Sequence, residues 1–146
     1  MWQMDKIKLT KLFRKYPAIK LAYLFGSRAD GSSGPMSDYD FGFYLKEMDP
    51  KKRFDLKLRV MADLGKMLQT DAVDVVILND TYNTELKYNI VHDGKLLYSQ
   101  GSFQLEVEPK ILNEYFDFRF TMQKYGLTRE KDHLENYDEL VEKIRK

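Results

Sequence analysis

The sequence contains no cysteine and no long hydrophobic run, and its charges nearly cancel. Its 146 residues carry 24 Lys and Arg against 23 Asp and Glu. Without cysteine, the chain cannot form disulfides, thiolate zinc sites, iron–sulfur clusters or a cysteine nucleophile. No segment approaches the ~18–20 apolar residues of a membrane span, and the balanced charge lacks the basic excess typical of nucleic-acid binding. We therefore expect a cytoplasmic globular domain with no membrane or direct nucleic-acid contact.

The length predicts a single domain. A chain of this size buries roughly 68–70% of its unfolded surface, enough for one hydrophobic core. The first ten residues carry three charges and contain no apolar run, so we expect no secretory signal. We expect residues 1–100 to form the core of the domain and residues 101–146 to form a C-terminal helical extension of it.

Helical and strand patterns alternate along the chain, which indicates an α/β or α+β fold. Short apolar runs rich in aromatic or β-branched residues predict strands over residues 19–25, 39–45, 72–78 and 95–99. Apolar residues spaced three and four apart predict helices over residues 5–16, 50–68 and 81–92, and two more around 111–125 and 134–144.

The helix expected over residues 50–68 carries two apolar stripes. One runs through Phe54 and Leu58, and the other runs through Val60 and Leu64. Apolar residues around so much of its circumference indicate a helix largely buried against the sheet.

Short signals mark where helices begin and end. Asp49 followed by Pro50 is a typical helix start, and Gly94 is the usual stop for the helix before it. The basic run at residues 51–53 lies in the first turn of the helix that begins at Pro50, where the helix dipole disfavours positive charge. An anionic partner would explain the run, but we expect it to be solvated.

The most informative segment consists of Gly26 and Ser27, ten intervening residues, and then Asp38 and Asp40. Side chains two apart on a strand point to the same face, so the two carboxylates would repel each other unless a cation neutralised them. Mg²⁺ is commonly held by one or two carboxylates together with substrate phosphates. A Gly-Ser turn after a strand suits phosphate binding through backbone N–H groups and the hydroxyl. The pattern therefore predicts a nucleotide site.

A third carboxylate would complete such a site. Asp74 is an isolated charge within the apolar run AVDVVIL, and a buried carboxylate is costly unless it is paired or binds a metal. Beside the other two it would bind metal and accept the proton of an incoming hydroxyl. Asp71, three residues earlier, would face the other way, so we prefer Asp74.

The segments LFGSRADG, SDYDFGFYL and VDVVIL together resemble the minimal nucleotidyltransferases of the DNA polymerase β superfamily. The signature of that family is Gly-Ser, about ten residues, Asp-x-Asp and a later Asp on another strand. The extended form G-S-x-A-x-G is also present, at residues 26–31. The resemblance covers residues 7–99 and implies a nucleotidyltransferase fold, in which helices flank a small mixed sheet and a helical tail follows.

The resemblance also implies the roles of particular residues. ATP would be the substrate, and two Mg²⁺ ions would be the cofactors, as in other two-metal sites. The implied catalytic and metal-binding residues are Asp38, Asp40 and Asp74, and the implied nucleotide-binding residues are Gly26, Ser27 and Arg28.

The short length and the helix around residues 114–117 resemble the one-domain members that act as antitoxins. Such members are paired with a HEPN-domain ribonuclease toxin and move AMP from ATP to its tyrosine hydroxyls. The implied partner is therefore a cognate HEPN toxin in a hetero-oligomer, and the implied activity is protein adenylylation with release of pyrophosphate.

Other functions remain open at this point. The acceptor could be a small molecule such as an aminoglycoside, although such enzymes usually carry a larger second domain. The chain could instead neutralise a toxin by binding alone, with a vestigial site. A nucleic-acid polymerase or tRNA-modifying enzyme would need a basic surface or a second domain.

Each candidate residue also has a plainer interpretation. The Gly-Ser turn could be an ordinary connection, and the aspartate pair could be a solvated strand edge. Asp74 could cap a neighbouring loop, and Arg28 could be a surface arginine. The combined spacing favours the functional interpretation.

Overall fold

The described residues contain four strands, which form one mixed sheet in the order β3-β2-β1-β4. The computed structural model describes residues 5–30, 38–47 and 49–126. The strands are β1 (Ile19–Phe25), β2 (Tyr39–Leu45), β3 (Val73–Ile77) and β4 (Lys95–Ser99). β1 pairs antiparallel with β2 and β4, whereas β3 pairs parallel with β2. The predicted small mixed sheet is confirmed.

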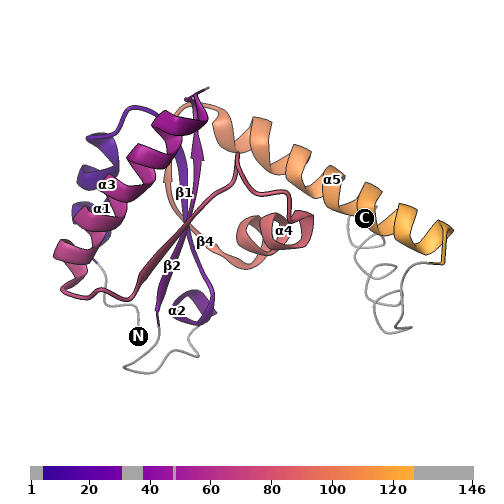
Figure 1. Cartoon of the computed structure of the whole chain (residues 1–146), viewed down its shortest axis with the longest axis horizontal. Helices are drawn as coiled ribbons and strands as arrows, with labels where there is room; N and C mark the ends of the chain where they lie inside the picture. The colour runs from indigo at the N-terminus through magenta and orange to yellow at the C-terminus, as the bar shows by residue number, and fades with distance from the viewer. Residues whose placement is uncertain (1–4, 31–37, 48, 127–146) are drawn as a thin grey trace.

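Helices cover both faces of this sheet (Figure 1). α1 (Lys6–Arg14) and α3 (Pro50–Leu68) pack on one face, and α4 (Thr84–Asp93) and α5 (Phe103–Lys124) pack on the other. A short helix, α2 (Ser27–Asp30), follows β1.

Alternation along β2 divides the core between the two faces. Phe41 and Phe43 are fully buried on the α1–α3 face, whereas Tyr44 packs with the α4–α5 cluster. Side chains alternate across a strand, so Asp40 shares its face with Tyr44. The fold therefore places Asp40 on the sheet face that α4 and α5 cover, and Asp38 directly precedes the strand.

Asp5 and Asp49 begin α1 and α3 as N-caps. The Asp5 carboxylate accepts hydrogen bonds from two backbone N–H groups of the first turn of α1, and the Asp49 carboxylate accepts one from Lys51. α1 is thus shorter than the predicted helix over 5–16, because Asp5 caps it and it ends at Arg14. The predicted start of α3 is confirmed.

The expectation that α3 is largely buried is wrong. Val60 and Leu64 are fully buried, but Phe54 is 56% exposed and Leu58 is 49% exposed. α1 covers part of the same face of a narrow sheet, so only one of the two stripes of α3 meets the core.

Gly94 ends α4, as predicted, but not through a left-handed backbone. Its φ is −74°, an ordinary extended conformation. A Cβ at this position would lie 2.3 Å from the carbonyl oxygen of Ile90 and 3.0 Å from that of Leu24. The absence of a Cβ at Gly94 therefore allows the end of α4 to pack closely against β1.

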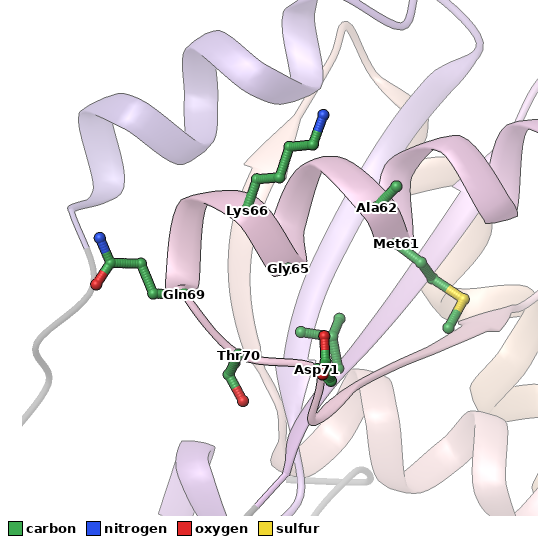
Figure 2. Close-up of a pocket in the computed structure, with 8 residues that line it drawn as sticks. Met61, Ala62, Gly65, Lys66, Gln69, Thr70 and Asp71 are labelled. Carbon is green, nitrogen blue, oxygen red and sulfur yellow. The ribbon is translucent and has the colours of Figure 1, made fainter.

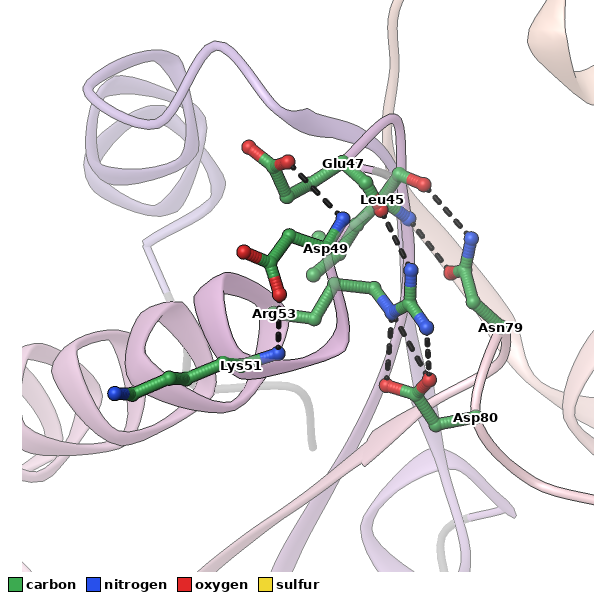
Figure 3. A network of polar contacts seen from close by, with 7 residues as sticks. All are labelled: Leu45, Glu47, Asp49, Lys51, Arg53, Asn79 and Asp80. Carbon is green, nitrogen blue, oxygen red and sulfur yellow. Dashed lines mark hydrogen bonds and ion pairs between the residues drawn. The ribbon is translucent and has the colours of Figure 1, made fainter.

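Arg53 is an ion-pair residue and not part of a solvated run. Its Nη2 lies 2.6 Å from Oδ1 of Asp80, and its Nη1 donates to the carbonyl oxygen of Glu47 at 2.7 Å (Figure 3). The Asn79 side chain accepts from the N–H of Leu45 and donates to its carbonyl oxygen, at 2.9 and 2.8 Å. These contacts tie the start of α3 and the end of β2 to the loop after β3.

The tail begins with α5, which confirms the helix predicted around 111–125. Val107 and Ile111 bury its first half, while Phe118 and Phe120 are exposed further along. The helix predicted around 134–144 lies outside the described residues. None of the described helices is both long and apolar enough to cross a membrane.

Tyr23 connects α5 to the central strand. Its hydroxyl donates to Oε1 of Glu108 at 2.6 Å. Burial raises the pKa of Tyr23, and the hydrogen bond and charge of Glu108 raise it further, so the hydroxyl remains a donor across the physiological range.

Replacing Tyr23 by phenylalanine is expected to lower the free energy of unfolding by about 1–2 kcal/mol, because the buried hydrogen bond is lost. Urea denaturation measures the change. Tyr82→Phe, at a 99% exposed side chain, is the matched control and should unfold as the wild type does. Equal stability of the two variants would contradict a structural role for the Tyr23–Glu108 contact.

Candidate active site

Strand pairing brings the predicted site residues together. In the antiparallel β1–β2 pair, Phe25 lies opposite Asp40, and in the parallel β2–β3 pair, Asp40 lies opposite Asp74. Gly26 follows Phe25 directly. Asp40 therefore lies between Gly26 at the end of β1 and Asp74 on β3, although these residues are far apart in the chain.

Gly26 is held against Asp40. Its φ of +77° lies in the left-handed region, and a Cβ there would be 2.5 Å from Oδ2 of Asp40. Glycine is therefore required for two reasons, the backbone conformation and the close carboxylate. Gly26 is exposed and Ser27 is half-buried at the start of α2, so the backbone of the turn is reachable from solvent beside the carboxylate.

The charges of two neighbouring aspartates act on Asp40. Burial raises the pKa of Asp40, and the negative charges of Asp74 and Asp38 raise it further. Such mutual repulsion is what a divalent cation relieves. Among the described residues, no three Asp, Glu or His side chains are arranged closely enough to hold a metal as they stand. The carboxylates are therefore neighbours, but they are not already arranged as a metal-binding site.

The prediction that Asp74 is buried is wrong, although its position is as expected. Asp74 is exposed, and its Oδ1 accepts a hydrogen bond from the N–H of Val75 at 3.0 Å. β3 is an edge strand of the described sheet, so a side chain within an apolar run can still reach solvent. The parallel register, and not burial, places this carboxylate beside Asp40.

Asp71 lies in a different place. It lines a hollow of about 510 Å³ formed with the C-terminal half of α3, where Met61, Gly65 and Lys66 also lie (Figure 2). None of the described residues around this hollow is a predicted site residue. The arrangement favours Asp74 over Asp71 as the third carboxylate.

Arg28 contacts an aromatic ring. Its guanidinium carbon lies 4.1 Å from the centre of the Tyr39 ring, a distance that allows a cation–π interaction. Tyr39 packs against the α1–α3 core and stacks on Phe41. This contact gives Arg28 a structural role, and its predicted contact with a nucleotide stays a prediction.

Two hollows adjoin residues of the predicted site. One of about 460 Å³ adjoins Asp74, and one of about 320 Å³ adjoins Gly26. Leu86 of α4 lines both. A transfer reaction needs room for a donor and an acceptor, and each hollow adjoins one residue of the predicted site.

The sequence did not reveal the contribution of α4. Asn89 and Asp93 line the hollow beside Gly26 together with Leu86. In the sequence these are ordinary polar and apolar residues of an amphipathic helix, and only the packing of α4 beside β1 brings them to the site. No motif could have identified them.

Three comparisons place the chain among known proteins. A family model described as polymerase beta, nucleotidyltransferase, matches residues 7–102. Protein adenylyltransferase MntA of Aphanizomenon flos-aquae is 26% identical over 144 residues, covering 91% of this chain and 87% of the relative.

Solved structures of toxin–antitoxin complexes are also similar. One, described as a toxin–antitoxin with AMP-PNP, has a TM-score of 0.68 and 27% identity, covering 84% of this chain and 95% of its own. Another contains a tri-AMPylated Shewanella oneidensis HEPN toxin in complex with an MNT antitoxin, with a TM-score of 0.59 and 26% identity, covering 86% of this chain and 95% of its own. Because the family model spans most of the chain, from the first helix to the end of the sheet, this protein belongs to the polymerase beta nucleotidyltransferase family.

Proposed function

We propose that this chain is a protein adenylyltransferase that transfers AMP from ATP to tyrosine hydroxyls of a HEPN ribonuclease toxin, and so acts as its antitoxin. The observation that carries the proposal is the strand register that sets Gly26, Asp40 and Asp74 side by side. The similarity to MntA and to complexes that contain HEPN toxins supports the acceptor class.

The donor atoms of the site fit Mg²⁺. Asp38, Asp40 and Asp74 offer hard carboxylate oxygens whose mutual repulsion a divalent cation would relieve. When bound, the metal stabilises charge on the attacking and leaving oxygens. We assign the three aspartates as its ligands.

The residues of the chain have separate tasks in the reaction. The Gly26 backbone and the Ser27 hydroxyl hold the phosphates, and Arg28 adds positive charge next to them. Asp74 accepts the proton of the acceptor hydroxyl. The hydroxyl oxygen forms a bond to the α-phosphorus, the bond from that phosphorus to the β-phosphate breaks, and pyrophosphate leaves.

We further propose a role for each region of the chain, a partner and a cellular location. Residues 1–100 form the catalytic core, and residues 101–146 form a helical extension of the same domain. The partner is a HEPN-family protein encoded beside this chain, and the pair acts in the cytoplasm.

Label transfer tests the proposal. The purified chain, the neighbouring HEPN protein and Mg²⁺ are incubated with ATP labelled at the α-phosphate or at the γ-phosphate. The HEPN protein should take up only the α-label. Asp38→Asn should abolish the uptake, whereas Asp71→Asn, at a carboxylate in the other hollow, should leave it unchanged. Uptake of the γ-label, or full activity of Asp38→Asn, would contradict the proposal; α-label on an added aminoglycoside alone would favour a small-molecule acceptor.

A further inference from the structure

The hollow beside Gly26 lies between the end of β1 and α4. It measures about 320 Å³, within the range of ~300–1,000 Å³ usual for small-molecule sites. Its described lining residues are Phe25, Gly26, Leu86, Asn89 and Asp93. Because Gly26 touches Asp40, a ligand in this hollow lies directly next to the reacting centre.

One wall of this hollow is formed by α4, and two glycines allow this helix to pack closely on the sheet. A Cβ on Gly42, in β2, would lie 3.0 Å from Cγ2 of Ile90, and a Cβ on Gly94, the C-cap of α4, would lie 3.0 Å from the carbonyl oxygen of Leu24 in β1. Ile90 is fully buried. The helix is thus packed directly on the backbones of β1 and β2, and the residues on either side of Ile90 are held in place. Asn89 and Asp93 consequently form a preorganised surface.

Asn89 and Asp93 lie one helical turn apart and face the same hollow. A carboxylate accepts hydrogen bonds from hydroxyl groups but repels phosphate. In a bound nucleotide, Asp93 is therefore suited to ribose hydroxyls, and the phosphates are directed to the Gly26 turn. One oxygen of that carboxylate, Oδ1, lies 2.7 Å from Nδ1 of His92.

The remaining lining residues suit a base. The Asn89 side chain offers a donor and an acceptor together, the combination that pairs with the N6 and N7 atoms of adenine. Phe25 and Leu86 supply aromatic and aliphatic surface for the faces of the base.

We propose that α4 carries the nucleoside specificity of this enzyme, with Asp93 binding the ribose hydroxyls and Asn89 reading the edge of the adenine base. The inference rests on the proposed function, because it takes ATP as the substrate.

Calorimetric titration of the full chain with non-hydrolysable ATP tests the sugar contact. With Mg²⁺ present, the wild type should bind the ribonucleotide at least about tenfold more tightly than its 2′-deoxy or 3′-deoxy counterpart, as expected for a hydrogen bond to a charged group. Asp93→Asn and Asp93→Ala should reduce this preference to near one. A variant that was merely misfolded would lose affinity for all the analogues equally.

The base contact is tested in the same way. Asn89→Leu should reduce the preference for the adenine over the cytosine nucleotide by about tenfold, while Glu85→Gln, on the same helix but outside the hollow, should retain both preferences. Nucleotide binding with both preferences intact in the Asp93 and Asn89 variants would overturn the inference and leave the proposed function standing. A wild type that binds no nucleotide would overturn the proposed function itself.

Discussion

Replacing Asp40 by asparagine is expected to abolish AMP transfer and, at the same time, to stabilise the metal-free protein. Asp40 is the central carboxylate of the three, opposite Asp74 across the β2–β3 pair. Losing a metal ligand at a site of developing charge removes several kcal/mol of transition-state stabilisation, or at least about 10³ in rate. Quantitative label transfer to the HEPN partner measures the loss.

The expected stabilisation of the metal-free protein arises because the substitution removes a repelled negative charge. Burial and the charges of Asp74 and Asp38 raise the pKa of Asp40 above its ordinary 3.8. A raised carboxyl pKa means that stability is highest below that ordinary value and is lost as the pH rises through the shifted pKa. At neutral pH the wild type is therefore destabilised by its own site, and the neutral asparagine removes the repulsion.

Thermal melts without metal should show this effect for Asp40→Asn. Because Asp40 is only half-buried, solvent screening limits the gain to about 1 kcal/mol or less, a rise in Tm of about 2–4 °C. The gain should disappear as the pH falls toward 4, and Mg²⁺ should stabilise the wild type but not Asp40→Asn. Asp71→Asn is the control. An unchanged or lower Tm for Asp40→Asn at neutral pH would mean that the three carboxylates do not repel one another.

Replacing Gly26 by alanine is the second change with a large expected effect. The added Cβ would meet Oδ2 of Asp40 at 2.5 Å, and the residue would keep a φ of +77°. The left-handed backbone alone costs roughly 1–2 kcal/mol for an L-residue. The clash must also move either the turn or the carboxylate, and misplacing a reacting group by about 1 Å can cost about 10² in rate. We expect AMP transfer to fall by about 10²-fold or more.

Two controls separate backbone strain from the clash. Gly126 has a similar φ of +65°, but a Cβ there would have nothing within 4 Å, so Gly126→Ala should reproduce the strain without the loss of activity. In the background of Asp40→Ala, the carboxylate is absent, and Gly26→Ala should cost less stability than in the wild type. Full transfer activity of Gly26→Ala would contradict the contact between the turn and the carboxylate.

Local patterns in the sequence were enough to predict the strands and the core motif. The Asp-x-Asp spacing predicts a shared face because side chains alternate along a strand; Asp40 lies in β2, and Asp38 directly precedes it. Strand order is different, since it depends on contacts far apart in the chain. Asp74 was expected to be buried because its apolar neighbours resemble those of a central strand, whereas β3 lies at the edge of the described sheet.

The other differences between the sequence-based predictions and the structure also arise from contacts between residues far apart in the chain. Arg53 was expected to be solvated, but its partner Asp80 lies 27 residues away along the chain. Asn89 and Asp93 face a hollow that exists only when α4 packs beside β1. Two glycines allow this packing: Gly94, which the sequence indicates only as a helix stop, and Gly42, whose place inside a strand does not reveal which helix approaches it.

The central claim is that the chain controls its partner by covalent adenylylation at the aspartate site. It is tested most directly by the intact mass and ribonuclease activity of the HEPN protein after incubation with ATP, Mg²⁺ and either the wild type or Asp74→Asn. The wild type should add whole AMP units to tyrosines and abolish ribonuclease activity, while Asp74→Asn should do neither. An unmodified HEPN protein that both forms inhibit equally would contradict the claim.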